Sequence, residues 1–156
     1  SETWCAGTGV EVRFSEICHQ LAEYTTKDTK FFIGSDSDIT NRKITFCKAI
    51  CIYGPDSKSH YFFSRNKTDI KTFPNLFSRM AEEARLSVDL AIDLNSKYQI
   101  PLHMIEIHLD VSPLDKGSKT SIFSDALKGY VRGAGFRCEI KPNAWASQSV
   151  ADRHSK

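Results

Sequence analysis

The chain has 156 residues, which is enough to bury the core of one compact domain and too few for two domains of ordinary size. Its 40% apolar and 26% charged residues are ordinary for a globular protein and exclude a disordered or fibrous chain. A net charge of +2 does not indicate a strongly basic protein, so any face that binds nucleic acid must be local.

Five cysteines are an odd number without a paired framework, and no secretory signal is recognisable, so we expect free thiols and a cytoplasmic protein. Cys47 and Cys51 lie four residues apart, as zinc ligands can, but no second close Cys or His pair completes a tetrahedral set. We interpret both as core residues. No apolar run approaches the ~20 residues that cross a bilayer, so no membrane partner is expected.

Residues 1–29 are expected to form an N-terminal extension with a helix over residues 14–24, where apolar residues recur at helical spacing. Residues 30–36 are typical of a buried strand. Residues 43–53 and 59–63 are rich in β-branched and aromatic residues and predict two more strands of an antiparallel meander. Residues 75–98 contain no Gly or Pro after Pro74, which predicts one long helix.

Residues 102–111 alternate between apolar and polar side chains and predict a fourth strand. A loop, a helix over residues 120–131, a fifth strand over 136–140 and a short final helix follow. This order predicts a single α/β domain over residues 1–156, with residues 30–156 as its core. We expect a mixed five-stranded sheet, in which the meander is joined by parallel strands, with helices on both faces.

Asp36 ends the predicted strand of large apolar residues, at the kind of strand end where α/β folds gather ligands. The alternative is an ordinary aspartate in the turn after a strand. Asp38 lies on the same face if the strand continues, but the turn-prone residues that follow favour a turn position for it.

Asp110 ends the fourth strand on the face that also carries Glu106 and His108, opposite a wholly aliphatic face. Three ionisable groups in a row need water or a metal to balance their charge. A strand with one solvated face would show the same alternation, so this pattern leaves both interpretations open.

Glu82 and Glu83 lie on different faces of the long predicted helix. Glu83 shares its face with Met80 and Leu90, whereas Glu82 shares one with polar residues. We therefore expect Glu83 to point inward and Glu82 to face water. Asp152, in the final predicted helix, would by itself be interpreted as a charge of the chain's tail.

An Asp ending the first strand of a meander, a Glu in the following long helix, an Asp ending the fourth strand and an Asp in a C-terminal helix together resemble the ribonuclease H-like nuclease superfamily. More narrowly, residues 32–37, 107–111, 135–136, 141–142 and 151–156, with Lys119 before a helix, resemble the bacterial and phage YkuK-like family of predicted nucleases. The resemblance spans roughly residues 30–156 and implies a ribonuclease H-like fold.

When the metal-binding acids of the superfamily are matched to this sequence by position, the resemblance implies that Asp36, Glu83, Asp110 and Asp152 bind metal. Glu82 is the alternative ligand from the helix. Oxygen ligands suit Mg²⁺ or Mn²⁺, and two such ions can hold the attacking water and the scissile phosphate in line. His154 is a candidate proton carrier. His108 is a second candidate, although a structural hydrogen bond is the more ordinary role for it.

Lys116 and Lys119 flank a predicted helix start, where backbone N–H groups and lysines can hold a phosphate, although ordinary helix capping explains the same residues. Lys141, Arg153 and Lys156 lie near the fourth acid in sequence and extend the candidate phosphate contacts, or else are solubilising charges.

The expected function is therefore divalent-metal-dependent hydrolysis of DNA or RNA. Cleavage of branched DNA by a homodimer and cleavage of RNA are both compatible with the fold. A non-catalytic nucleic-acid-binding or assembly module that retains the fold is the alternative, and a phosphatase of small nucleotides is a third.

Overall fold

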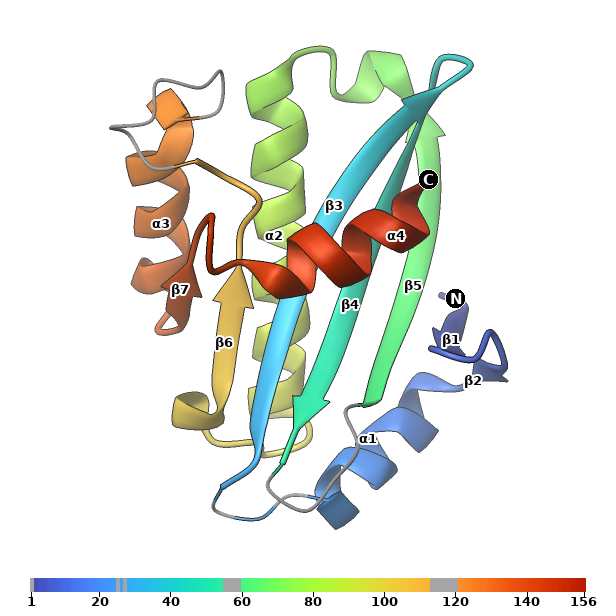
Figure 1. The fold of residues 1–156 in the computed structure, drawn as a ribbon, viewed down its shortest axis with the longest axis vertical. Helices are drawn as coiled ribbons and strands as arrows, with labels where there is room; N and C mark the ends of the chain where they lie inside the picture. The colour runs from blue at the N-terminus through green and yellow to red at the C-terminus, as the bar shows by residue number, and fades with distance from the viewer. Residues whose placement is uncertain (1, 25, 27, 55–59, 113–120) are drawn as a thin grey trace.

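The computed structural model describes residues 2–24, 26, 28–54, 60–112 and 121–156, and it shows one seven-stranded mixed sheet with helices on both faces (Figure 1). The order of strands across the sheet is β2-β1-β5-β4-β3-β6-β7. The strands are β1 Trp4–Ala6, β2 Glu11–Val12, β3 Lys30–Thr40, β4 Lys43–Tyr53, β5 His60–Asp69, β6 Ile105–His108 and β7 Arg137–Glu139. The main helices are α1 Phe14–Tyr24, α2 Leu76–Ser96, α3 Ser124–Gly133 and α4 Asp152–Ser155, the last preceded by a π-helical turn, η5, over Ala146–Ala151.

The predicted five-stranded arrangement forms the centre of this sheet. Strands β3, β4 and β5 pair as an antiparallel meander, and β6 and β7 join β3 in parallel. The strand count was wrong because the N-terminal extension adds β1 and β2 to the edge of β5. These strands have only three and two residues, too few for an alternating pattern, and β1 is anchored by Trp4, which is 2% exposed.

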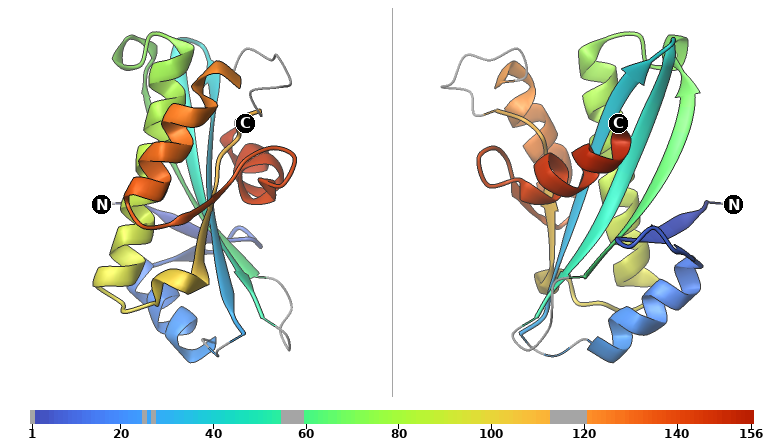
Figure 2. Two further views of the ribbon diagram at one scale, coloured as in Figure 1. Left: turned by 90° about the vertical axis from the view of Figure 1, so that its left-hand side faces the viewer. Right: turned by 45° about the vertical axis from the view of Figure 1, so that its right-hand side comes forward.

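The helices divide between the two faces of the sheet, as predicted. Helices α2 and α3 lie on one face, and the C-terminal segment η5–α4 crosses the other (Figures 1 and 2). The large core lies on the α2 side and includes Ile17 and Leu21 of α1, Ile33 of β3 and Val88 of α2. Only a small apolar cluster lies under the C-terminal segment, so that face of the sheet leaves room for polar groups.

Helix α2 begins where the sequence predicts. The side chain of Asn75 accepts a hydrogen bond from the backbone N–H of Ser78, whose hydroxyl in turn accepts one from the N–H of Asn75. This capping box fixes the first turn and therefore the rotation of the helix about its axis. No helix of the described residues is long and apolar enough to cross a membrane.

Strand β3 continues to Thr40, four residues beyond the predicted end at Asp36. Asn41 and Arg42 have positive φ angles of 53° and 64° and form the tight turn into β4. The neighbouring strand β6 is much shorter and pairs with β3 only as far as Gly34, opposite His108. From Ser35 onward, β3 is therefore open on the β6 side.

Candidate active site

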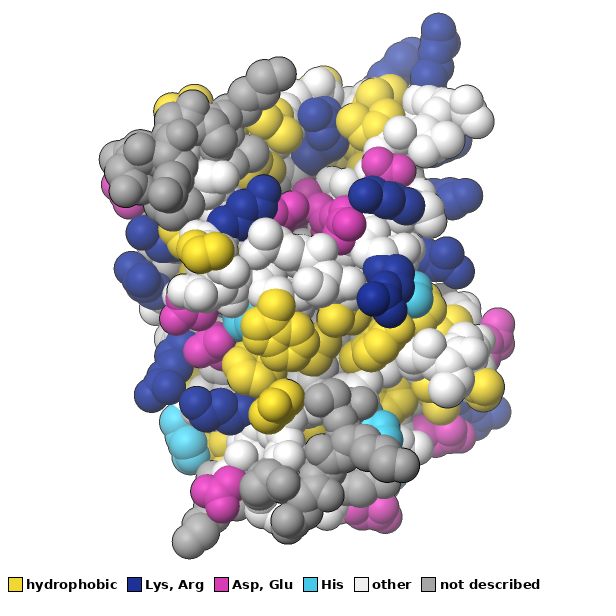
Figure 3. Space-filling view, viewed as in Figure 1, with side chains coloured by type: hydrophobic (Ala, Val, Ile, Leu, Met, Phe, Trp, Pro, Cys, Tyr) yellow, Lys and Arg dark blue, Asp and Glu magenta, His cyan; other side chains and the backbone are white. Residues whose placement is uncertain are grey.

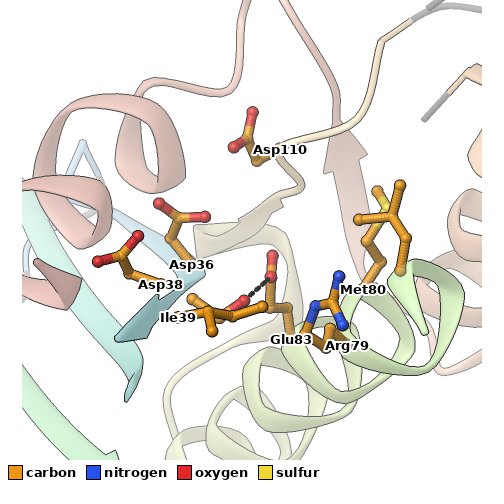
Figure 4. A pocket seen from close by; sticks show the side chains of 9 residues that line it. Asp36, Asp38, Ile39, Arg79, Met80, Glu83 and Asp110 are labelled. Atoms are coloured by element: carbon orange, nitrogen blue, oxygen red, sulfur yellow. Dashed lines mark hydrogen bonds between the residues drawn. The ribbon is translucent and has the colours of Figure 1, made fainter. Parts of the chain in front are cut away.

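The open edge of β3 borders a cavity of about 330 Å³ between the sheet and the start of α2 (Figure 4). Side chains from both faces of the sheet reach this cavity because no strand covers the edge. The residues that line it are Asp36, Ser37, Asp38, Ile39, Leu76, Arg79, Met80, Glu83 and Asp110. Three of the four acids assigned by resemblance, Asp36, Glu83 and Asp110, thus lie in one cavity.

Asp36 is the most deeply buried of these acids, with 7% of its surface exposed. Burial, followed by the negative charge of Glu83, raises the pKa of Asp36 to about 9. Asp110 contributes in the same direction. At neutral pH Asp36 is therefore protonated, and its ionised form needs a compensating cation.

Asp152, the fourth acid, reaches Asp36 from the C-terminal segment. The two carboxyl groups share a hydrogen bond, which lowers the pKa of Asp152 and helps to raise that of Asp36. Asp36 therefore keeps the proton and donates it to the carboxylate of Asp152. The ammonium of Lys156 lies 3.3 Å from Asp152 Oδ2 and balances the remaining charge.

Gly34 allows the C-terminal segment to come this close. A Cβ atom at Gly34 would lie 2.4 Å from the backbone nitrogen of Ser147 and 2.5 Å from the carbonyl carbon of Ala146. The obstacle is backbone, so no side-chain rotation relieves it. The absence of a side chain two residues before Asp36 thus lets η5 rest on β3 and sets the position of Asp152.

Glu83 enters the cavity from α2 and accepts a hydrogen bond of 2.6 Å from the hydroxyl of Ser37 (dashed line in Figure 4). Burial raises its pKa to about 8, the bond from Ser37 opposes this shift, and the charge of Asp110 adds to it. The guanidinium of Arg79, one turn earlier on the same helix, lowers the pKa. The structure thus places Glu83 inward, as its helical phase predicts.

Asp110 lies two residues after the end of β6 and lines the same cavity (Figure 4). The ammonium of Lys141 lies 2.9 Å from Asp110 Oδ1, but off the direction of a hydrogen bond. Within the described residues this buried oxygen accepts no hydrogen bond. A buried carboxylate oxygen without a donor is a good ligand for a cation.

The donor set fits a hard divalent cation in chemistry, because all four acids offer oxygen atoms and the group includes no described Cys or His. Their geometry is looser. Among the described residues, no three His, Cys, Asp or Glu side chains lie close enough together to hold a metal ion in this conformation. Asp36, Glu83 and Asp110 line one cavity and Asp152 contacts Asp36, but no three of these carboxylates form a compact cluster.

Other predicted site residues lie elsewhere. Lys116 and Lys119 fall outside the described residues. The ring of His154 stacks on Phe63 at 3.8 Å, and its Nε2 lies 2.9 Å from the hydroxyl of Tyr61, over β5 and not among the residues that line the cavity.

His108 has the structural role that we considered the more ordinary one. It is 1% exposed, and its Nδ1 accepts a hydrogen bond from the N–H of Ala146. Nε2 must then carry the proton that is donated to Glu106 Oε2, 2.8 Å away. Glu106 and His108 thus balance one another, and of the three polar groups on this strand only Asp110 lies in the cavity.

Two residues of the cavity were missed by sequence reasoning. Asp38 was interpreted as a turn residue, but β3 continues through it on the face of Asp36. Arg79 was noted only as part of the polar face of α2. Its spacing of four residues from Glu83 places both on one side of the helix, and this was the available signal.

Comparison with known proteins assigns the chain to a family. The sequence model of the family described as Ribonuclease H-like matches residues 12–156, which include every element that carries one of the four acids. No curated protein and no solved structure shows significant similarity to the chain. The narrower resemblance to the YkuK-like family agrees with the family match. The chain belongs to the ribonuclease H-like family.

Proposed function

We propose that the protein is a divalent-metal-dependent nuclease that hydrolyses phosphodiester bonds of DNA or RNA. The observation that supports this best is the convergence of acids from four separate chain segments at the open edge of β3. Membership of the ribonuclease H-like family supports a nuclease over other hydrolases. The family alone does not decide the activity, because one fold hosts many functions.

In this proposal Asp36, Glu83, Asp110 and Asp152 hold two Mg²⁺ or Mn²⁺ ions. Such a pair, when bound, activates the attacking water and stabilises the charge that develops on the phosphate and the leaving oxygen. The residues supply the negative charge and the positions of the ligands. The raised pKa values of Asp36 and Glu83 mean that both acids release protons on ligation, so affinity should increase with pH.

The cations around the acids also have a role. Lys141 beside Asp110, and Lys156 beside Asp152, partly neutralise carboxylates that would otherwise repel one another. We propose that both ammonium groups turn to substrate phosphate when the carboxylates take up metal. Contacts of Lys116 and Lys119 with substrate phosphate stay a prediction. His154 is engaged with Tyr61 and Phe63, so we assign it to positioning the C-terminal segment rather than to proton transfer.

One observation favours a second candidate, the non-catalytic nucleic-acid-binding module. In the described part of the chain, no three of the acids lie close enough together to hold one ion without a change of conformation. A module that kept the fold but lost metal binding would show such a spread. We place this candidate second because the burial of Asp36 and Glu83 beside one another is costly in a protein that never binds a cation.

Two further proposals concern the setting of the protein. All five cysteines are free thiols, which supports a cytoplasmic location. A homodimer would allow paired cuts in branched DNA, and sedimentation with and without a branched substrate tests it.

The test is incubation of the protein with duplex DNA, RNA–DNA hybrid, single-stranded DNA and RNA, a branched DNA and free nucleotides, each with Mn²⁺ or with EDTA. We expect cleavage of at least one polymer in Mn²⁺ only, and its loss in Asp36→Asn. Glu82→Gln is the matched control, because it changes an acid of the same helix outside the cavity. Release of phosphate from free nucleotides alone would identify the small-nucleotide phosphatase instead. Binding of polymers without cleavage would favour the module.

A further inference from the structure

Two basic residues of β5 lie in the same cross-strand rows as the site acids. In the register of the sheet, Asp36 pairs with Cys47 and Cys47 with Arg65, while Asp38 pairs with Thr45 and Thr45 with Lys67. Directly paired residues point to the same face of a sheet. Arg65 and Lys67 are therefore on the face of Asp36, two strand spacings or about 10 Å across from it.

Both side chains are exposed and free to bind an anion. Among the described residues, neither Arg65 nor Lys67 forms an ion pair with an acid. The guanidinium of Arg65 lies 5.7 Å from the centre of the Phe63 ring, which supports it from below. By contrast, Lys48 on the other face of the sheet pairs with Glu2, and Arg85 on α2 pairs with two acids.

The same area receives a third cation from the C-terminal segment. Arg153 is exposed and directly precedes His154, whose ring stacks on the same Phe63 ring that the guanidinium of Arg65 approaches. Arg65 and Arg153 therefore both lie near His154. Figure 3 shows the acidic side chains in the centre of this face, with Lys and Arg side chains beside them and along the edge where β5 runs.

The edge of β5 at these residues is also uncovered. Strand β1 pairs with β5 only over residues 62–64, and no described strand pairs with the outer edge of β5 beyond Ser64. An extended polyanion that leaves the acids toward this edge would therefore run beside α4, which crosses the same face over β3, β4 and β5, and would meet no described strand beyond β5.

We propose that Arg65, Lys67 and Arg153 form a track that binds the sugar–phosphate backbone of the nucleic acid on one side of the cleavage site. This inference rests on the proposed function, because it takes the acids as the point of cleavage. The groups are suited to phosphates, and contacts to phosphates hold the strand without reading its sequence. At about 3.4 Å of rise per nucleotide, 10 Å corresponds to contacts about three nucleotides from the scissile phosphate.

The test measures binding of the full-length chain to fluorescent oligonucleotides in EDTA, as a function of salt. The probes are DNA and RNA of one sequence, single-stranded and duplex. The double variant Arg65→Gln/Lys67→Gln should bind less tightly, and the slope of log affinity against log salt should fall by about 1.4 to 1.8, because each lost phosphate contact removes about 0.7 to 0.9. In Mn²⁺ the variant should show a raised KM and an unchanged kcat.

Lys97→Gln/Arg132→Gln is the matched control, because it removes two exposed charges from α2 and α3 and should leave the slope unchanged. The conservative variant Arg65→Lys/Lys67→Arg should retain the slope. An equal loss in the control variant, an unchanged slope in Arg65→Gln/Lys67→Gln, or failure of the wild-type chain to bind any probe would overturn the track. The proposed nuclease fails separately, if nothing is cleaved while the slope still depends on Arg65 and Lys67.

Discussion

Helix α2 carries adjacent glutamates on two faces, and their charges are balanced in different ways. Glu82 accepts two hydrogen bonds, of 2.6 and 2.7 Å, from the guanidinium of Arg85, which also bonds to Asp89. Glu83 receives one bond from the hydroxyl of Ser37. Burial and the charge of Asp110 raise its pKa, and its own charge helps to raise that of Asp36. Glu82 on the outer face is thus paired with a guanidinium, whereas Asp36 and Glu83 in the cavity form no ion pair with a described residue.

This difference separates structural acids from candidate functional ones. A paired acid at the surface adds little to stability and can be replaced at small cost. A buried group of acids costs stability unless it is protonated or binds a cation, so its retention calls for a function. Substitutions in the cavity should therefore have large effects on activity or stability, and substitutions on the outer face of α2 should have small ones.

The largest contrast is expected between Glu83→Gln and Glu82→Gln. If Glu83 is a metal ligand, Glu83→Gln should lower kcat by roughly 10²-fold or more, as loss of a group that stabilises transition-state charge commonly does. Glu82→Gln should keep kcat within about twofold, because Glu82 is paired with Arg85 and does not line the cavity. Cleavage rates in saturating Mn²⁺ provide the measurement. Equal losses in the two variants would remove the distinction between the faces.

Gly34→Ala tests how the cavity is assembled. The new methyl group meets backbone of η5, so we expect a loss of about 1–3 kcal/mol in the free energy of unfolding and displacement of Asp152 from Asp36. Thermal melting should show a decrease in Tm of about 2–4 °C for each kcal/mol.

Gly129→Ala is the control for this substitution. A Cβ at Gly129, inside α3, meets nothing within 4 Å and should stabilise the helix by up to about 1 kcal/mol. A Gly34→Ala protein as stable and active as the wild type would contradict the close approach of η5 to β3.

Because the cavity holds buried acids with raised pKa values, the free energy of unfolding should depend on pH in the presence of EDTA. The pKa values of Asp36, about 9, and Glu83, about 8, lie above their ordinary values, so the folded state binds more protons than the unfolded one. Stability is therefore greatest near pH 5 and falls as pH rises toward 8.5. In EDTA we expect Tm to decrease over this range. Asp36→Asn should flatten the profile, and a wild-type Tm that rises with pH would contradict the shifts.

The smallest effect is expected on the outer face. Arg85→Gln removes two ion pairs whose members are partly or largely exposed, so we expect a loss of about 0.5–1 kcal/mol and unchanged cleavage. Denaturant unfolding at low and high salt gives the measurement, and the difference should shrink in high salt. A large loss of activity would mean that the outer face also serves the site.

The features that the sequence predicted correctly lie within single helices or strands whose hydrophobic pattern repeats over several residues. The phase of α2 placed Glu83 inward, and the alternation of β6 separated its aliphatic face from its polar one. The hydrophobic residues of β3 predicted a strand ending near Asp36. Each of these depends on neighbours within one element, which a single sequence contains.

Features that depend on contacts between distant segments could not be predicted in this way. Asp38 belongs to the cavity because β3 continues against β4 after β6 has ended. Arg65 and Lys67 reach the face of Asp36 through the register of three strands. The need for Gly34 arises from η5, more than 110 residues later in the chain.

The most direct test of the central claim is a calorimetric titration of the full-length chain with Mn²⁺ at pH 8, compared with Asp36→Asn, Asp110→Asn and Glu82→Gln. We predict binding of two ions by the wild type and by Glu82→Gln, with proton release, and loss of binding in both Asp variants. Absence of heat at millimolar Mn²⁺, or equal binding by Asp36→Asn, would contradict the assignment of the acids at the open edge of β3 as a metal site.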